Sequence, residues 1–196
     1  MTGVLSSEET VPSTARQRIL DTAYELFSRR GIRAVGIEEV IARAAVAKAT
    51  LYRHFPSKDD LVLAFLAERE ERWTRQLVEA GAKERGNTAE EQLLAIFDVF
   101  HEWFQQDDYE SCSFVKVLLE TGDRKNPAGN ASVQYLENIR TIVRTLAEEA
   151  GLRDPEAFAL SWHILMKGAI VQAAEGDREA ARRAKELAQL LLDQHR

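Results

Sequence analysis

The sequence has little of the residue types that end helices or cross-link a chain. Its 196 residues include four prolines, ten glycines and one cysteine, Cys112. So few prolines and glycines exclude collagen and a turn-dense β-sandwich, and 45% hydrophobic residues exclude a chain that is disordered throughout. A single cysteine excludes an intramolecular disulfide and a cysteine-rich zinc site. It also indicates a reducing compartment, for which the cytoplasm is the default.

Long uncharged apolar runs are also missing, which predicts a soluble protein with no membrane contact. A membrane-spanning helix needs about 18 or more apolar residues, whereas the apolar stretch around Phe114 is interrupted by Lys116. The first dozen residues lack the basic start, apolar run and small-residue cleavage site of a secretion signal. We therefore expect residues 1–12 to form a flexible arm.

Positive charge is scarce in the chain as a whole but not near its start. The chain carries 26 basic and 32 acidic residues, a net charge of −6. Residues 13–58, which we call the head, carry nine basic and four acidic residues. Residues 59–196, which we call the body, carry 17 basic and 26 acidic residues. A basic head on an acidic body indicates a separate segment that contacts nucleic acid.

Apolar residues recur every three or four positions, so the sequence predicts an all-α protein of nine helices without a strand. The expected helices cover about residues 14–30, 37–44, 46–55, 57–80, 88–104, 111–121 and 131–150, then one from Pro155 to Gly176 and one from there nearly to the C-terminus. Thr88 and Glu91 form a capping box, and Gly81 and Gly86 are expected to break the helical pattern before it.

The third expected helix has the composition of a helix that enters the major groove of DNA. Its polar surface residues are Lys48, Thr50, Tyr52, Arg53 and His54. Two short helices joined by a tight turn fit the second into a groove about 12 Å wide, where hydroxyl, amino and guanidinium groups donate to phosphates and base edges. Lys58 adds a positive charge at the start of the next helix. Taken alone, these charges also fit a solvated, basic helix end.

A combination of short motifs covers residues 16–61. It consists of ILDTA at residues 19–23, Leu26-Phe27, Gly31, residues 40–46 and TLYRHFPSKDDL at residues 50–61. This combination resembles the N-terminal domain of the TetR family of bacterial transcriptional regulators. The resemblance implies a three-helix helix-turn-helix domain followed by a helical bundle, in a homodimer that a small molecule releases from DNA. It also implies that Lys48 and Ala49 face bases, while Thr50, Tyr52, His54 and Lys58 mostly hold the DNA backbone.

Two positions depart from the pattern of that family. Ala45 stands in the turn where glycine is usual, and Ala47 stands where a serine-like residue usually caps the third helix. Loss of such a cap typically costs about 1 kcal/mol, which a packed domain tolerates. With fewer side chains to read bases directly, we expect more dependence on DNA shape.

Aromatic residues in the body predict either a packed core or a pocket for a largely apolar ligand, and the sequence leaves both open. The candidate pocket residues are Phe97, Phe100, His101, Phe104, Phe114, Tyr135, Trp162, His163 and Met166. Aromatic stripes are usually core, but the polar residues among them could orient a ligand between helices. We expect Cys112 to be a small core residue rather than a redox-sensing thiol, and we expect no metal and no cofactor.

The last two helices predict a surface for a second copy of the chain. The candidate interface residues are Phe158, Trp162, Met166, Ala184, Leu187 and Leu191. Packing of these residues back onto the bundle is the alternative. Dimerisation is favoured because one recognition helix reads too few base pairs, whereas two about 34–36 Å apart reach successive grooves on one face of DNA.

Together these features predict a transcriptional regulator, most readily a repressor, that acts in the bacterial cytoplasm at the nucleoid. The expected domains are the arm (1–12), the DNA-binding head (13–58) and a ligand-binding and dimerisation body (59–196). The expected partners are a pseudo-palindromic DNA operator, a second copy and a small-molecule effector. Two alternatives stay open: a helical DNA-binding scaffold without a ligand, and a helical-bundle enzyme that uses His101, His163 and Glu102. No catalytic motif supports the enzyme.

Overall fold

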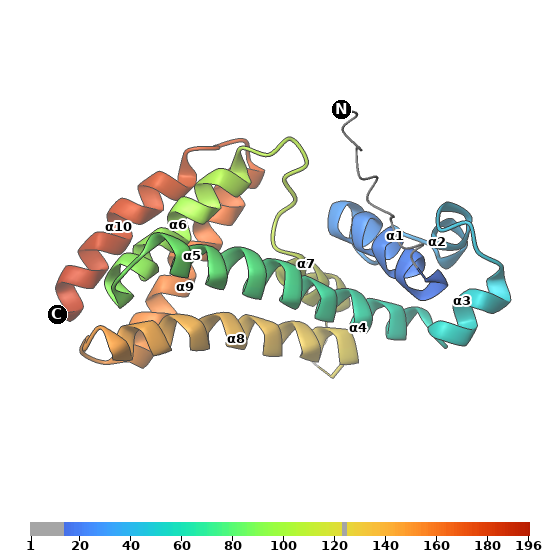
Figure 1. Ribbon diagram of the computed structural model, residues 1–196, viewed down its shortest axis with the longest axis horizontal. Helices are drawn as coiled ribbons and strands as arrows, with labels where there is room; N and C mark the ends of the chain where they lie inside the picture. The colour runs from blue at the N-terminus through green and yellow to red at the C-terminus, as the bar shows by residue number, and fades with distance from the viewer. Residues whose placement is uncertain (1–13, 123–124) are drawn as a thin grey trace, which may run out of the picture.

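The computed structural model describes residues 14–122 and 125–196, and every regular element in these ranges is a helix (Figure 1). The elements are α1 (Ala15–Arg30), α2 (Ile37–Arg43), α3 (Lys48–His54), α4 (Lys58–Arg69), the π-helix η1 (Glu70–Glu79), α5 (Ala80–Arg85), α6 (Ala89–Phe104), α7 (Ser113–Thr121), α8 (Pro127–Glu149), α9 (Pro155–Ala174) and α10 (Ala180–His195). Because α4, η1 and α5 are continuous, the described chain contains nine helical rods, which confirms the predicted all-α fold. The expected arm, residues 1–12, lies outside the described residues.

One long rod joins the two ends of the molecule. Figure 1 shows α1, α2 and α3 at one end, the rod of α4, η1 and α5 running from α3 across the molecule, and α8 alongside it. Helices α6, α9 and α10 lie at the other end (Figure 1). The head packs on the rod through α1, where Phe27 and Phe65 meet edge to face with their ring centroids 5.5 Å apart. The rod therefore belongs to the core of the head and to that of the body.

Most helix starts follow the signals in the sequence. The side chains of Thr14 and Ser57 cap α1 and α4 by accepting backbone N–H groups. Thr88 and Glu91 form the predicted capping box at α6. Asp154 caps α9, which has Pro155 in its first turn. These local contacts explain why the sequence locates the helix starts so closely.

Two helix boundaries differ from the prediction. Gly81 does not break the rod, which continues to Arg85 and ends at Gly86. A Cβ atom at Gly81 would lie 3.0 Å from a methyl group of Val99, so this glycine allows close packing of α5 on α6. Helix α8 begins at Pro127 rather than near residue 131, because the Asn126 side chain accepts the N–H groups of the first turn.

Among the described residues, helix α9 is the one helix of membrane-spanning length and composition, although it contains the charged residues Glu156 and Lys167. By length and composition alone it could span a membrane, although 44% of its most apolar window is buried inside the structure. A core helix passes the same test. Phe158, Trp162 and Met166 of α9 are at most 1% exposed, as in a core helix.

Side chains of the body bond to the main chain of the head at the end of α1 and just after it. Lys116 of α7 donates from Nζ to the carbonyl oxygen of Ser28 at 2.8 Å. The carboxylate of Glu120, also on α7, accepts the backbone N–H of Arg33 at 2.9 Å. Gly31, with a φ of +79°, lies so close to Glu120 that a Cβ atom would collide with its carboxylate. Helix α7 therefore holds the main chain of the head between residues 28 and 33.

Candidate nucleic-acid interface

Helix α3 is anchored to the head by one face and leaves the other to solvent. Leu51 is fully buried, as is Val40 of α2, and Phe55 just after α3 is 2% exposed. Tyr52, at 38% exposed, points away from this core. The apolar positions of a seven-residue helix thus fix its orientation, and its polar positions form an accessible surface.

All seven predicted DNA-contacting residues lie on this surface. Lys48, Ala49, Tyr52 and Arg53 are exposed, and Thr50, His54 and Lys58 are partly exposed. Each has side-chain surface available to a phosphate or a base edge. The structure thus brings together the set that the sequence predicts, over α3 and the first residue of α4.

Two of the lysines are held in place by neighbours. Lys48 Nζ lies 2.7 Å from Glu38 Oε1, and this hydrogen bond together with the charge of Glu38 raises the pKa of Lys48. Lys58 donates from Nζ to the carbonyl oxygen of Val35 at 2.7 Å. Since Val35 precedes α2, Lys58 also ties the start of the rod to the loop before the helix-turn-helix. Both ammonium groups are positioned before DNA arrives.

One basic residue beside α3 was missed by the sequence reasoning. The guanidinium carbon of Arg16, in the first turn of α1, lies 5.2 Å from the ring centroid of Phe55, directly after α3. Arg16 is exposed. Its charge counted toward the basic head, but sequence spacing alone does not show that the start of α1 reaches the end of α3.

The turn before α3 contains the strained backbone that its composition predicts. Ala45 has a φ of +50°, in the left-handed region, and Ala47 makes no side-chain cap to α3. A left-handed conformation costs a residue with a Cβ about 1–2 kcal/mol, and glycine avoids that cost while losing more conformational entropy on folding.

We expect Ala45→Gly to raise the free energy of unfolding by up to about 1 kcal/mol, because strain relief exceeds the added entropy cost. The matched control is Ala67→Gly at an exposed position inside α4, which should cost about 1 kcal/mol. Urea unfolding of both variants measures the two changes. A destabilised Ala45→Gly variant would contradict the left-handed turn.

Comparison with known proteins places the whole chain in one family. The sequence pattern of bacterial regulatory proteins of the tetR family matches residues 19–65. The crystal structure of a TetR-family transcriptional regulator from Streptomyces coelicolor superposes with a TM-score of 0.85 at 30% identity, covering 92% of this chain and 95% of that one. This chain belongs to the TetR family.

Named relatives of this TetR-family chain are also regulators. HTH-type transcriptional regulator YjdC of Escherichia coli is 24% identical over 178 residues, covering 87% of this chain and 91% of the relative. HTH-type transcriptional repressor KstR2 of Rhodococcus jostii is 28% identical over 149 residues, covering 72% and 67%. The chain is therefore a DNA-binding transcriptional regulator, which confirms the resemblance predicted from its sequence.

The aromatic residues of the TetR-family body form a packed core. Phe97, Phe100, Phe104, Phe114, Trp162 and Met166 are each at most 1% exposed. Phe97 and Trp162 have ring centroids 5.3 Å apart, and Tyr135 is half-buried against Phe114 at 5.3 Å. His101 is instead partly exposed and lies 3.4 Å from the side-chain nitrogen of Gln105. The rings thus pack on one another, as the core alternative predicts.

His163 is the buried histidine of this core. It is 4% exposed, and its Nδ1 atom has no hydrogen-bond partner in the described chain. Burial, with smaller contributions from the charges of Lys167 and Arg140, lowers its pKa from 6.5 to about 3. The folded protein therefore keeps this imidazole neutral in weak acid. Cys112, the free thiol, is also buried, and burial raises its pKa, as expected for an unreactive core residue.

This depressed pKa predicts acid sensitivity. Below pH 6.5 the unfolded chain binds a proton that the folded imidazole does not, so stability falls as the pH is lowered toward 3. At pH 5 the loss from this group is about 2 kcal/mol. In urea unfolding at pH 7 and pH 5, His163→Leu should lose about that much less stability than the wild type. Equal losses in wild type and His163→Leu would contradict the assignment.

Three of the six predicted interface residues lie in the core of their own chain, and the other three, Ala184, Leu187 and Leu191, line grooves at the surface. Phe158, Trp162 and Met166 are buried in their own chain and offer no contact surface. The exposed apolar residues of α9 and α10 are Leu160, Ile164, Val171, Leu187 and Leu190. A groove of about 350 Å³ between the two helices is lined by Ile164, Leu165, Leu187, Leu190 and Leu191, among others. Ala184 and Leu187 line its continuation along the same helices.

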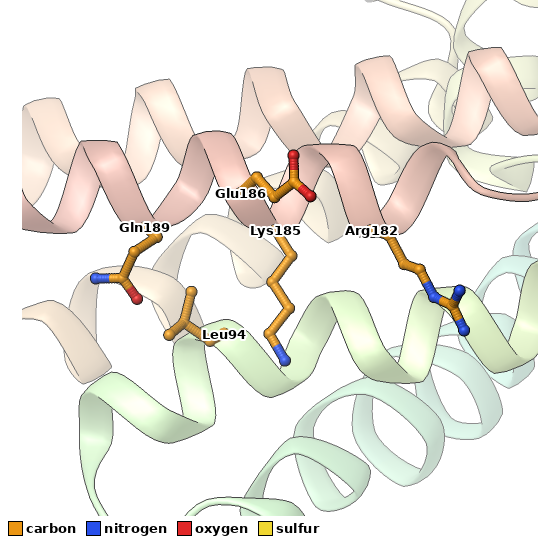
Figure 2. A pocket seen from close by; sticks show the side chains of 5 residues that line it. All are labelled: Leu94, Arg182, Lys185, Glu186 and Gln189. Carbon is orange, nitrogen blue, oxygen red and sulfur yellow. The ribbon is translucent and has the colours of Figure 1, made fainter.

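A groove of about 390 Å³ between α6 and α10 is lined in part by Lys185, which forms an ion pair within the chain. Figure 2 shows Lys185 extending from α10 toward α6, beside Leu94. Its Nζ lies 2.7 and 2.6 Å from the two carboxylate oxygens of Asp98. This ion pair joins α10 to α6 beside the groove and already supplies the counter-charge of the lysine.

Proposed function

We propose that this TetR-family regulator is a ligand-responsive repressor that binds a pseudo-palindromic operator as a homodimer and that a small molecule releases it. The exposed polar face of α3, held by buried Leu51, carries this proposal. The proposed division is the arm (1–12), the DNA-binding domain (13–58) and the body (59–196). The name of KstR2, a repressor that aligns with 72% of this chain, supports repression.

The proposed roles on DNA follow from position and chemistry. Lys48 and Ala49, in the first turn of α3, face the base edges, with the methyl group of Ala49 suited to a thymine methyl. Thr50, Tyr52, Arg53, His54 and Lys58 hold the phosphate backbone. We add Arg16, because it sits on Phe55 at the end of α3.

The proposed dimer forms through the exposed apolar residues of α9 and α10. A two-fold axis brings the same surface of both copies together. This pairing would set the two α3 helices about 34–36 Å apart, as successive major grooves require. The proposed function requires neither catalysis nor a membrane. We propose that the protein acts at the nucleoid in the bacterial cytoplasm.

Footprinting of the purified full-length protein on DNA that flanks its own coding region tests the function. We expect protection of two half-sites on one face of the duplex, centred about one helical turn apart or a multiple of it. Protection of one half-site, or none on any flanking fragment, would contradict the dimeric operator complex. The footprint is then repeated with metabolite fractions. If no fraction weakens binding to the operator, the result favours the alternative of a DNA-binding scaffold without a ligand.

Lys58→Ala should weaken binding to every DNA sequence about equally. It removes one phosphate contact per half-site, so the slope of log affinity against log salt should fall by about one unit for each subunit. Mobility-shift titrations at several salt concentrations measure this slope. Lys83→Ala, at an exposed position in α5 of the body, is the control and should leave the slope unchanged. An unaltered slope for Lys58→Ala would remove Lys58 from the contact set.

A further inference from the structure

An exposed ion pair lies at the start of the helix that contacts DNA. Glu38, in the first turn of α2, accepts through Oε1 a hydrogen bond from Nζ of Lys48, in the first turn of α3, at 2.7 Å. Their side chains are 67% and 63% exposed, whereas those of the neighbouring pair, Glu39 and Arg30, are 33% and 47% exposed. Such exposed pairs contribute little to stability. Folding therefore gives little reason for a carboxylate at position 38.

A carboxylate at this position opposes binding to DNA in general. Phosphates dominate the affinity for DNA of any sequence, and they repel the charge of Glu38. Glu38 also neutralises Lys48, so the pair as a whole brings no net positive charge to the duplex. A surface that only held phosphates would bind more tightly without Glu38. The pair is better suited to a partner that offers both hydrogen-bond acceptors and a donor.

The major-groove edge of a G·C pair has these groups. Guanine presents the acceptors N7 and O6, and cytosine presents the N4 amino group as a donor. An ammonium group carries three N–H groups, so Lys48 keeps two for guanine while it donates one to Glu38. Glu38 uses Oε1 for Lys48, so its Oε2 atom can accept from cytosine. In an A·T pair the amino group of adenine takes the place of O6, and the ammonium group finds one acceptor there instead of two.

We propose that Glu38 determines specificity by accepting a hydrogen bond from cytosine N4 while Lys48 donates to guanine N7 and O6 of the same base pair. The N-terminal residues of a recognition helix contact base edges, and the contact with Lys48 brings Glu38 to that place. At a G·C pair the cytosine amine replaces the water that the carboxylate loses, whereas a pair without that donor leaves the carboxylate unsatisfied. This inference rests on the proposed operator binding and adds a residue of α2 to it.

Selection of binding sites from a random duplex library by the purified full-length protein tests this reading. The wild type should enrich a G·C pair at one position of each half-site at least about tenfold over the other pairs. Glu38→Ala should lose this preference, keep those at other positions, and bind non-specific duplex more tightly. Glu39→Ala is the matched control, because it removes the same charge from the next residue, which pairs with Arg30 instead. It should select the same sites as the wild type.

The outcomes of this selection separate two kinds of failure. An unchanged preference in Glu38→Ala, or a preference for A·T that depends on Glu38, would overturn the specificity role while operator binding stands. A wild type that enriches no sequence would contradict operator binding itself, and this inference with it.

A modified base distinguishes contact with cytosine from positioning of Lys48. N4-methylcytosine still pairs with guanine, but its methyl group replaces the N–H that faces the major groove. Introduced at the selected position, it should weaken binding of the wild type and of Glu39→Ala at least about tenfold in mobility-shift titrations. Glu38→Ala should lose less than about twofold, because it has no carboxylate to receive that N–H. Equal losses in the wild type and Glu38→Ala would show that Glu38 does not contact cytosine.

Discussion

Ile164→Glu is expected to convert the proposed dimer to monomers and to abolish operator binding at concentrations that saturate the wild type. Ile164 is 71% exposed and lines the groove between α9 and α10 together with Leu187 and Leu190. Because the proposed dimer has a two-fold axis, its interface would contain the new carboxylate of both copies. Burying each carboxylate costs several kcal/mol of lost hydration. The dimer should therefore weaken at least about 100-fold, which corresponds to about 2.7 kcal/mol. Sedimentation equilibrium measures the association, and mobility shift measures DNA binding.

Leu119→Glu separates this effect from a general effect of surface charge. Leu119 is 75% exposed on α7, outside the proposed interface. Its variant should remain dimeric and bind the operator. A dimer that survives Ile164→Glu, or one that is lost in Leu119→Glu, would place the partner surface elsewhere.

Arg69→Ala should lower the free energy of unfolding by about 3–5 kcal/mol, the usual cost of removing one partner from a buried ion pair. The Arg69 side chain is 5% exposed, and its Nη1 atom bonds to Glu110 at 2.8 Å and to the Tyr24 hydroxyl at 2.9 Å. Its guanidinium carbon also lies 5.7–5.9 Å from the ring centroids of Tyr24, Trp73 and Trp103. The substitution leaves Glu110 without its cation and opens a cavity among these rings.

Arg72→Ala is the matched control for this prediction. Arg72 lies one turn later and pairs with Asp21 and Glu68, but its side chain is 40% exposed. Exposed pairs contribute about 0–1 kcal/mol, so the control should lose far less stability. Urea unfolding followed by tryptophan fluorescence compares the two. Similar losses in both variants would show that burial of Arg69 does not determine its contribution to the free energy of unfolding.

The sequence predicts this fold well because helices are specified locally. Caps such as Thr88 and Asp154 and apolar residues every three or four positions act within one helix, so their signal is complete in the sequence. The proposed partner surface is harder to predict from the sequence because α9 is apolar on nearly every side. Ile164 and Trp162 are then equally plausible contacts, and only packing on neighbouring helices shows which is buried.

The buried charged residues of the rod illustrate a second limit. Residues 68–72 read Glu-Arg-Glu-Glu-Arg, which in a helix predicts a solvated surface. In the fold, Arg69 and Glu70 are nevertheless buried, because α8, the α6–α7 connection and α1 close over that part of the rod. This burial depends on contacts across 41 to 68 residues of sequence, which no local pattern records.

The bonds from α7 to the head end on main-chain atoms, the carbonyl oxygen of Ser28 and the N–H of Arg33. Ser28 is fully buried in α1, which limits the side chains that fit there, but Arg33 is exposed and any amino acid except proline at position 33 offers the same N–H group. Mutations at position 33 can therefore accumulate without uncoupling the domains. Descendants of this regulator are free to vary there while the connection through which a bound effector would act is inherited intact.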